Sequence, residues 1–246
     1  MTVQFENFEY NYTKGGKPYF APNDRGRRIG RDIKRRVQTA HQFDPFVYHL
    51  RAGGHVAALH CHRPQAHFAK VDIRRFFYSI SRMRVQRALA GISIPRARHY
   101  AKWSCVRNPY LDPRYALPYG FIQSPILATL VLMESVVGGT LREIHAQRTV
   151  VVSLYMDDIA LSSDDLPALN DAFDRLLAAF EEANFELSPN KVSPPSMALD
   201  LFNCHLETGR TEVRQERIDK FNSEPRSPAS INAFDLYCDS IEAGNI

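Results

Sequence analysis

Two adjacent carboxylates, Asp157 and Asp158, interrupt an otherwise apolar stretch at residues 149–162. The segments on either side are short and rich in Val, Leu and Ile, which is typical of strands. A polar pair between two such segments predicts a β-hairpin with the carboxylates at its tip. Adjacent carboxylates repel each other and resist burial, and a divalent cation relieves both penalties. The stretch therefore predicts either a Mg²⁺ or Mn²⁺ site or a solvated Asp-Asp turn.

A third acid, Asp72, lies in the strand-like segment 68–73. One interpretation is a core carboxylate satisfied by Arg74 or Arg75. The other is a further metal ligand, because two-metal phosphoryl transfer uses carboxylates to hold two ions about 3.5–4 Å apart. Carboxylates that arrive from separate strands suit that chemistry.

The remaining pattern alternates helices with short strands and predicts an α+β fold, with helices packed on a small antiparallel sheet. Extended pieces are expected around Tyr10–Tyr12 and Pro18–Ala21, and a strand pair at 198–206 and 211–214. Helices are expected at 29–43, from a Ser79 or Ser81 cap to Ala90, from Ser124 to Gly138-Gly139, and at about 165–184 with a Ser163 or Asp164 cap. The last 25 or so residues give no clear prediction.

Charge is divided unevenly along the chain. Residues 1–114 carry 22 Lys and Arg against 7 Asp and Glu, whereas residues 115–246 carry 9 against 20. The basic half suits a nucleic acid or another anionic partner. Two oppositely charged, solvated surfaces that attract each other explain the same pattern.

The four cysteines, Cys61, Cys105, Cys204 and Cys238, form no C-x-x-C pair. A disulfide framework is therefore not expected, and a cytoplasmic location fits better. No run of about 18 apolar residues predicts a membrane span. His60-Cys61-His62 with His67 invites a zinc interpretation, but the spacing lacks a second ligand pair, so loop or core histidines are the preferred interpretation.

Four collinear segments resemble the reverse transcriptase family over roughly residues 10–220. Tyr155-Met-Asp-Asp158 resembles the Y-x-D-D box, and Asp72-Ile-Arg-Arg-Phe-Phe-Tyr-Ser-Ile80 resembles the D-I-x-x-F-F-x-S-I form of bacterial retron-type enzymes. Leu117-Pro-Tyr-Gly-Phe-Ile-Gln-Ser-Pro125 is similar to L-P-Q-G-x-x-x-S-P, and Asn184-Phe-Glu-Leu-Ser-Pro-Asn-Lys191 to the later F-x-L-x-x-x-K segment.

The resemblance implies a right-hand polymerase fold with basic fingers, a palm, and a short or missing thumb. It places the N-terminal fingers at 1–68, the palm at 69–92 and 119–200, an insertion at 93–118, and a primer-grip hairpin with a thumb remnant at 201–246. It also implies that Asp72, Asp157 and Asp158, with the backbone carbonyl of Ile73, hold two Mg²⁺ ions, or Mn²⁺.

Roles for other residues also follow from the resemblance. Lys191 would act on the leaving pyrophosphate, and Phe77 would exclude a 2′-hydroxyl and so favour dNTPs. Tyr119 stands where the family usually has Gln, which predicts altered nucleotide handling. The nucleotide site would be completed by Gly120, Arg27 and Arg28, and the nucleic acid would be contacted by Lys14, Lys17, Arg35, Arg36 and Ser124.

The function implied is an RNA-directed DNA polymerase that uses an RNA template, a DNA or RNA primer, and dNTPs. A role in bacterial anti-phage defence, with a structured non-coding RNA or a partner protein, is expected because the V-T-G segment of retron enzymes is absent after Lys191. The alternatives are a catalytically weak or inactive RNA-binding subunit of a larger complex, another template-dependent polymerase, and a metal-free basic RNA-binding protein.

Overall fold

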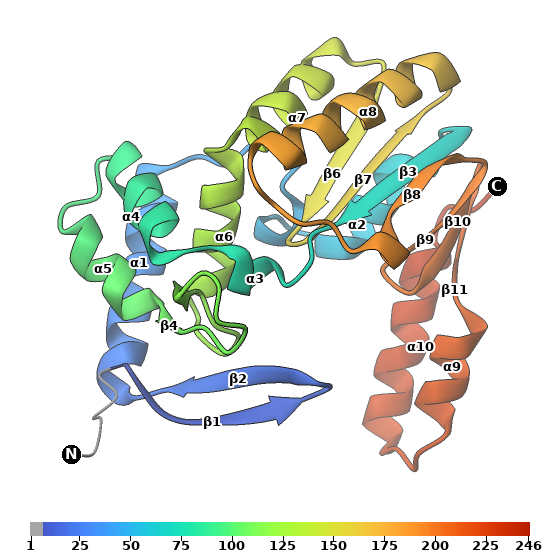
Figure 1. Cartoon of the computed structure of the whole chain (residues 1–246). Coiled ribbons are helices and arrows are strands. Elements are labelled where there is room, and N and C mark those ends of the chain that lie inside the picture. The colour runs from blue at the N-terminus through green and yellow to red at the C-terminus, as the bar shows by residue number, and fades with distance from the viewer. Residues whose placement is uncertain (1–6) are drawn as a thin grey trace. The chain divides into compact units, whose positions relative to one another are not determined.

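The computed structural model describes residues 7–246 and divides into two compact units built from interleaved segments (Figure 1). Unit 1 contains the described residues up to Phe43 together with Ile73–Gly139 and Phe180–Glu186. Unit 2 contains Asp44–Asp72, Thr140–Ala179 and Leu187–Ile246. These units are defined by contacts within the chain and not as polymerase subdomains. The division into fingers, palm and thumb therefore stays a prediction.

A four-stranded antiparallel sheet forms the centre of unit 2. Its order is β6 (Val151–Tyr155), β7 (Asp158–Ser163), β3 (His67–Asp72) and β8 (Ser193–Ser196). Most apolar side chains of β3, β6 and β7 are almost fully buried, which is expected for strands covered on both faces. Helix α2 (Gly54–His62) packs against β6 and β7. The predicted hairpin at 149–162 is confirmed.

Two helices cross from one unit into the other, α7 (Val136–Gln147) and α8 (Leu166–Glu182). Within unit 2, Arg175 of α8 donates to Glu143 of α7 at 2.8 Å, so the two helices lie side by side (Figure 1). The buried face of α8 in this unit is formed by Leu169, Phe173 and Leu176, as its helical spacing predicts.

A second sheet and two helices complete unit 2. The sheet has the order β11 (Arg210–Val213), β10 (Cys204–Glu207) and β9 (Ala198–Leu201). Helices α9 (Gln215–Asn222) and α10 (Pro228–Glu242) follow it. Leu59, Phe68 and Ile241 belong to one buried cluster, so α2, β3 and α10 share a core.

Unit 1 contains a two-stranded hairpin of β1 (Phe8–Lys14) and β2 (Lys17–Pro22), and a bundle of helices. Phe8 and Phe20 of the hairpin pack with Tyr78 and Phe121 in one buried cluster. The helices are α1 (Asp24–Ala40), α3 (Phe76–Ser79), α4 (Arg82–Gly91), α5 (Ala97–Ser104) and α6 (Ser124–Met133), with the short pair β4 (Val106–Arg107) and β5 (Tyr115–Ala116).

Three local predictions need correction. The helix from Ser124 does not run to the glycine pair, because it ends at Met133 and α7 begins three residues later, passing through both glycines. Helix α8 is capped by Asp165, whose carboxylate accepts from the Ala168 N–H at 3.0 Å, rather than by Ser163 or Asp164. The segment 198–206 is not one strand but two, β9 and β10, which are separated by Phe202 and Asn203. The C-terminal segment, whose residues give no clear prediction, forms α10.

Between the two possible caps for α4, the structure selects Ser81, whose hydroxyl accepts from the Arg84 N–H at 3.2 Å.

Among the described residues, no single helix is long and apolar enough to cross a membrane. The pair α6 and α7, bent by 73°, meets that test only when the two are taken together, by length and composition.

Candidate active site

The strand register of unit 2 places two of the three predicted acids opposite each other. Asp72, the last residue of β3, pairs with Asp158, the first residue of β7. Asp158 also pairs with Tyr155 of β6 across the hairpin tip, which leaves Met156 and Asp157 as the two turn residues. Because β3 and β6 flank β7, the sheet brings Asp72 to the same edge as the Asp157-Asp158 tip.

The hairpin tip has a strained backbone. Met156 has φ 59°, in the left-handed region that costs a residue with a Cβ roughly 1–2 kcal/mol. Its N–H donates to Nδ1 of His49 at 3.4 Å, and the His49 ring lies edge-on to Tyr155. Burial lowers the pKa of His49 to about 4, so the ring is neutral at pH 7 and its nitrogen can accept. His49 was not predicted, since no sequence pattern links residue 49 to the tip.

The electrostatics of Asp158 show the cost of gathering acids here. Burial, followed by the negative charges of Asp157 and Asp72, raises its pKa to about 7, and Lys191 and Lys70 oppose that rise. Because like charges at short range cannot all ionise cheaply, the three acids need a cation to be charged together. The edge of the sheet therefore favours a bound positive charge.

Asp72 is 3% exposed and both of its carboxylate oxygens have partners. Ser188 donates its hydroxyl to Oδ1 at 2.6 Å, and Lys191 donates Nζ to Oδ2 at 2.7 Å. The Arg74 alternative is excluded in this structure, since Arg74 pairs with Glu186. Arg75 instead lies with its guanidinium 3.9 Å from the centre of the Tyr110 ring.

A short turn carries Ser188 and Lys191 to Asp72. The Ser188 N–H donates to the backbone carbonyl of Asp72 at 2.8 Å, and the Lys191 N–H donates to the carbonyl of Ser188 at 2.9 Å. The 3₁₀ turn Pro189–Lys191 thus holds the lysine three residues after the serine. Burial lowers the pKa of Lys191, but the bond to Asp72 and the charges of Asp72, Asp158 and Asp157 outweigh it and raise that pKa. Ser188 was missed, because a serine before a proline reads only as a turn residue.

The donor set suits a hard divalent cation, because carboxylate oxygens are the ligands that Mg²⁺ and Mn²⁺ prefer. As they stand, no three His, Cys, Asp or Glu side chains among residues 7–246 converge on one point as metal ligands do. Lys191 supplies the nearest positive charge to Asp72. The residues therefore fit a metal by chemistry and by charge, and the roles of Asp72, Ile73, Asp157 and Asp158 as ligands stay predictions.

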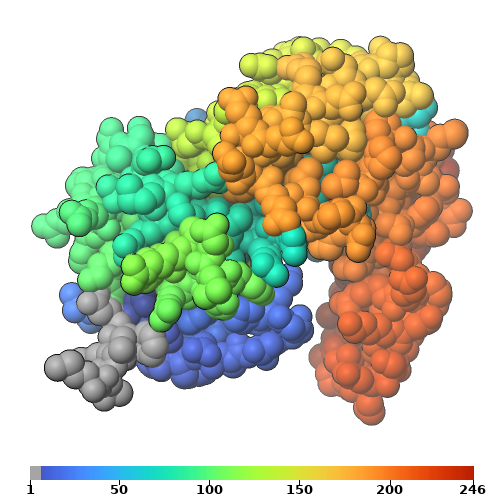
Figure 2. Space-filling model, viewed as in Figure 1, coloured from blue at the N-terminus to red at the C-terminus, as the bar shows by residue number. Residues whose placement is uncertain are grey.

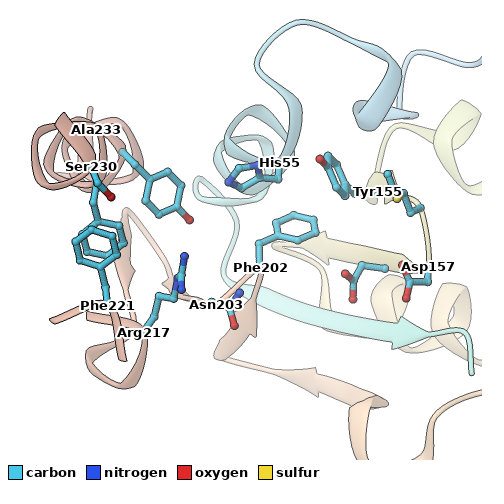
Figure 3. A pocket seen from close by; sticks show the side chains of 13 residues that line it. His55, Tyr155, Asp157, Phe202, Asn203, Arg217, Phe221, Ser230 and Ala233 are labelled. Carbon is cyan, nitrogen blue, oxygen red and sulfur yellow. The ribbon is translucent and has the colours of Figure 1, made fainter. Parts of the chain in front are cut away.

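A cavity of about 610 Å³ in unit 2 opens beside the hairpin tip (Figure 3). Asp157 and Asp158 line one end, and side chains of α9 and α10, among them Phe221, line the other. Figure 3 shows Tyr155, His55 and Phe202 between the two ends. The rings of Tyr155 and Phe202 lie 5.3 Å apart, so the cavity wall next to the acids is aromatic.

Three of the predicted nucleotide residues of unit 1, Phe77, Tyr119 and Gly120, lie together. The Tyr119 ring lies 4.8 Å from that of Phe77 and 5.2 Å from that of Tyr19, and Lys17 Nζ lies 5.3 Å from its centre. Gly120 has φ 99°, and a Cβ there would overlap the carbonyl of Phe20. The glycine is therefore required by the approach of β2, whatever contact it makes with a template.

The other residues predicted to contact the nucleotide or the nucleic acid lie at the surface of unit 1, except for Ser124. Arg27 pairs with Glu9 at 3.2 Å, and both Arg35 and Arg36 pair with Asp32. Lys14, Lys17 and Arg28 are exposed. Ser124, by contrast, is fully buried where α6 begins, so its predicted contact with nucleic acid disagrees with its position.

His62, considered for zinc, is a buried core histidine in unit 2. Its Nδ1 bonds the Ser162 hydroxyl at 2.7 Å and its Nε2 bonds the Ser153 hydroxyl at 2.8 Å. Burial lowers its pKa to about 3. The ring joins α2 to the hairpin strands β6 and β7.

Comparison with known proteins agrees with this geometry. The sequence profile of the reverse transcriptase family, RNA-dependent DNA polymerases, matches residues 13–197. The chain belongs to the reverse transcriptase family. No curated protein matches the chain.

Solved structures support the reverse transcriptase fold. A foamy viral protease-reverse transcriptase in complex with double-stranded DNA matches with TM-score 0.54 and 16% identity, over 91% of this chain and 34% of that one. Telomerase from Candida albicans, in complex with a fragment of telomeric RNA, matches with TM-score 0.52 and 9% identity, over 74% and 36%. The chain spans about a third of the length of these two proteins. The α+β fold with fingers and palm similar to theirs is therefore confirmed.

Proposed function

We propose that this chain is an RNA-directed DNA polymerase that extends a primer with dNTPs. The proposal rests first on the pairing of Asp72 with Asp158 in register on adjacent strands, with Asp157 in the turn beside them. Three acids at one edge of a sheet are costly, as the raised pKa of Asp158 shows. Membership of the reverse transcriptase family explains why that cost is kept.

Two Mg²⁺ ions, when bound by these carboxylates, would activate the primer 3′-hydroxyl and neutralise charge on the incoming triphosphate. The chain's own contribution is positional. Strands β3 and β7 fix two of the carboxylates, and Ser188 holds the Asp72 side chain through Oδ1. Lys191 is protonated at pH 7, as its raised pKa requires, so it can offer charge or a proton to the departing pyrophosphate.

Preference for dNTPs is assigned to Phe77. Its ring is 7% exposed and packs against Tyr119, so a sugar placed on it meets a rigid apolar surface. Such a surface has no partner for a 2′-hydroxyl, which would lose its bonds to water. The Arg27, Arg28, Lys14 and Lys17 side chains are proposed to contact the triphosphate and the nucleic acid.

We further propose that the enzyme is bacterial or phage-related, cytoplasmic, and acts in anti-phage defence with a structured non-coding RNA or a partner protein. The support is the retron-like form of the segment Asp72–Ile80 and the absence of the V-T-G segment after Lys191.

A second candidate is a catalytically weak or inactive, RNA-binding relative that serves as a subunit of a larger complex. Tyr119 favours it, because a tyrosine packed between Tyr19 and Phe77 replaces the amide that usually helps to hold the nucleotide sugar. Another template-dependent polymerase is a third possibility, and incorporation of rNTPs would distinguish it.

Primer extension on poly(rA)/oligo(dT) and on RNA co-purified with the protein tests the proposal. The reaction is supplied with Mg²⁺ or Mn²⁺ and with dNTPs or, separately, rNTPs. The control is Asp157→Asn/Asp158→Asn, which keeps side-chain size and removes both charges. We expect DNA synthesis by the wild type and none above background by the control.

The opposite outcome is equally clear. If neither protein extends any template, and RNA binds both with the same affinity, the polymerase assignment fails and the RNA-binding subunit is supported. Preferential use of rNTPs would instead assign an RNA polymerase and would contradict the role given to Phe77.

A further inference from the structure

A strongly basic cavity in unit 1 lies between α4 and α5. Its volume is about 910 Å³, and its lining includes Arg82, Arg96, Arg98 and Lys102. The lining contains no carboxylate. Each of the two helices has an exposed face, and their residues form part of the green and teal surface in Figure 2.

The sequence around this cavity lacks acids altogether. Residues 73–111 contain nine Lys and Arg and no Asp or Glu. Among residues 7–246, no carboxylate lies within 4.0 Å of the guanidinium of Arg96 or Arg98. Both side chains are exposed. Like charges that face one space repel each other, and an anion in that space would relieve the repulsion.

The backbone at Arg96 adds a separate observation. Arg96 precedes α5 with φ 60°, in the left-handed region that glycine or asparagine enters more cheaply. A long cationic side chain is thus retained at a position that penalises it by about 1–2 kcal/mol. Strain of this kind is typical of residues that serve a ligand.

We propose that this cavity binds the phosphodiester backbone of an RNA segment. Guanidinium groups match phosphate oxygens as paired donors, and three of the four cations are arginines. The exposed ring of His99 and the amide of Gln86 line the same cavity and offer a base a stacking surface and hydrogen bonds. An acidic protein would use the cations but not these groups, so RNA is favoured.

The inference extends the proposed function, since it takes RNA as the partner, but it requires no polymerisation. It gives RNA a contact surface built from α4 and α5. None of the residues proposed to bind metal ions or the incoming nucleotide belongs to this surface. A structured RNA held there would stay with the protein during synthesis.

The test compares two triple variants of the full chain, each in the Asp157→Asn/Asp158→Asn background. Arg96→Gln/Arg98→Gln/Lys102→Gln removes three charges from the cavity. Arg175→Gln/Arg210→Gln/Arg226→Gln removes three from unit 2 as a matched control. Binding of an unstructured single-stranded RNA is measured by fluorescence anisotropy over a series of salt concentrations, with circular dichroism to verify folding.

We expect the cavity variant to bind RNA at least about tenfold more weakly at physiological salt. A plot of the logarithm of the association constant against log salt has a negative slope, and this slope should become less steep by about 2, since each lost phosphate contact contributes about 0.7. The control should stay within about twofold of the parent. A folded cavity variant with unchanged affinity and slope would overturn the proposal. Polyglutamate that binds the parent more tightly than RNA, and loses binding in the cavity variant, would also overturn it.

Failure of this proposal is distinguishable from failure of the polymerase. If the wild type extends no primer but the cavity variant loses RNA affinity, the cavity assignment stands alone. If the wild type extends primers and the cavity variant binds RNA normally, only the cavity assignment fails.

Discussion

The carboxylate of Asp72 is bonded by two residues, each through a different oxygen, and the two have separable roles. Ser188 bonds Oδ1 and also fixes the turn that carries Lys191, which bonds Oδ2. Residues that orient a metal ligand through a hydrogen bond typically contribute 10–100-fold to metal affinity or activity. The pair can therefore be tested one residue at a time.

Ser188→Ala should raise the Mg²⁺ concentration for half-maximal primer extension by roughly tenfold, because Asp72 loses its fixed orientation. Titration of Mg²⁺ at saturating dNTP measures the change. Ser196→Ala is a suitable control, since Ser196 bonds the Ala198 carbonyl and not an acid. An unchanged Mg²⁺ requirement would show that Ser188 does not orient Asp72.

Lys191→Met should lower the melting temperature more in EDTA than in Mg²⁺. Without the ammonium group, a carboxylate that is 3% exposed loses the cationic partner at its Oδ2, which is destabilising until a metal ion replaces it. Differential scanning fluorimetry in the two buffers gives the difference. Equal losses in EDTA and Mg²⁺ would separate Lys191 from the metal site.

His62 makes the stability of the folded chain depend on pH. Its pKa in the folded state is about 3, below the ordinary 6.5, so between these values the unfolded chain binds a proton that the folded one does not. Stability is therefore full above pH 6.5 and falls as pH decreases, by about 1.4 kcal/mol per unit for this one group. His49, with its pKa lowered to about 4, acts in the same direction.

Urea unfolding at pH 7 and pH 5 should thus show a wild type that is less stable at pH 5, and His62→Gln should reduce that difference by about 2 kcal/mol. The substitution also lowers stability at pH 7, because two buried hydroxyls lose partners. His99→Gln, at an exposed position, serves as the control. A pH dependence equal in wild type and His62→Gln would remove this explanation.

At the scale of elements, the two glycines of α7 form a matched pair. A Cβ at Gly138 would overlap the backbone carbonyl of Met133, whereas a Cβ at Gly139 would meet nothing within 4 Å. Gly138→Ala should therefore destabilise by roughly 1–3 kcal/mol through overpacking. Gly139→Ala should stabilise by about 0.5–1 kcal/mol, as in other helices. Chemical unfolding of both variants tests the close packing at the bend between α6 and α7.

Elements whose residue pattern is local could be predicted from the sequence, and those set by tertiary packing could not. The hairpin of β6 and β7 could be predicted because strand-forming residues flank the charged pair Asp157-Asp158. The break after Met133 was not, since Glu134 and Ser135 are ordinary helical residues and the break depends on the Gly138 contact. Helices α9 and α10 were hidden by Pro225 and Pro228, although Pro228 sits where a helix tolerates it, after the Ser227 cap.

The same distinction applies to the site. The three acids could be predicted because carboxylates in apolar strands are unfavourable unless they bind a cation. The partners of Asp72 could not, because Ser188 reaches it only through a turn that follows α8 by several residues. Burial of Ser124 was likewise invisible, since a serine before a proline is equally compatible with a surface position.

At the scale of the whole molecule, the interleaving of chain segments between the two units determines how the protein unfolds. The chain passes between the two units five times, and α7 and α8 each belong to both. A helix that spans a boundary cannot unfold at one end without losing cooperativity at the other. We therefore expect a single unfolding transition.

The one tryptophan, Trp103, lies buried in unit 1 and reports on that unit alone. Far-ultraviolet circular dichroism reports on both units. The two probes should give the same urea midpoint. Midpoints that differ by more than experimental error would show that the units unfold independently, and the shared helices would then not couple them.

The Lys191–Asp72 pair has a practical consequence for kinetics. Since the lysine satisfies the buried acid, the four-stranded sheet can fold without a divalent ion. Protein can then be purified in chelator, loaded with template and nucleotide, and triggered by rapid mixing with Mg²⁺. Every molecule would begin its first turnover together, so a stopped-flow instrument can time the first nucleotide addition of the proposed polymerase.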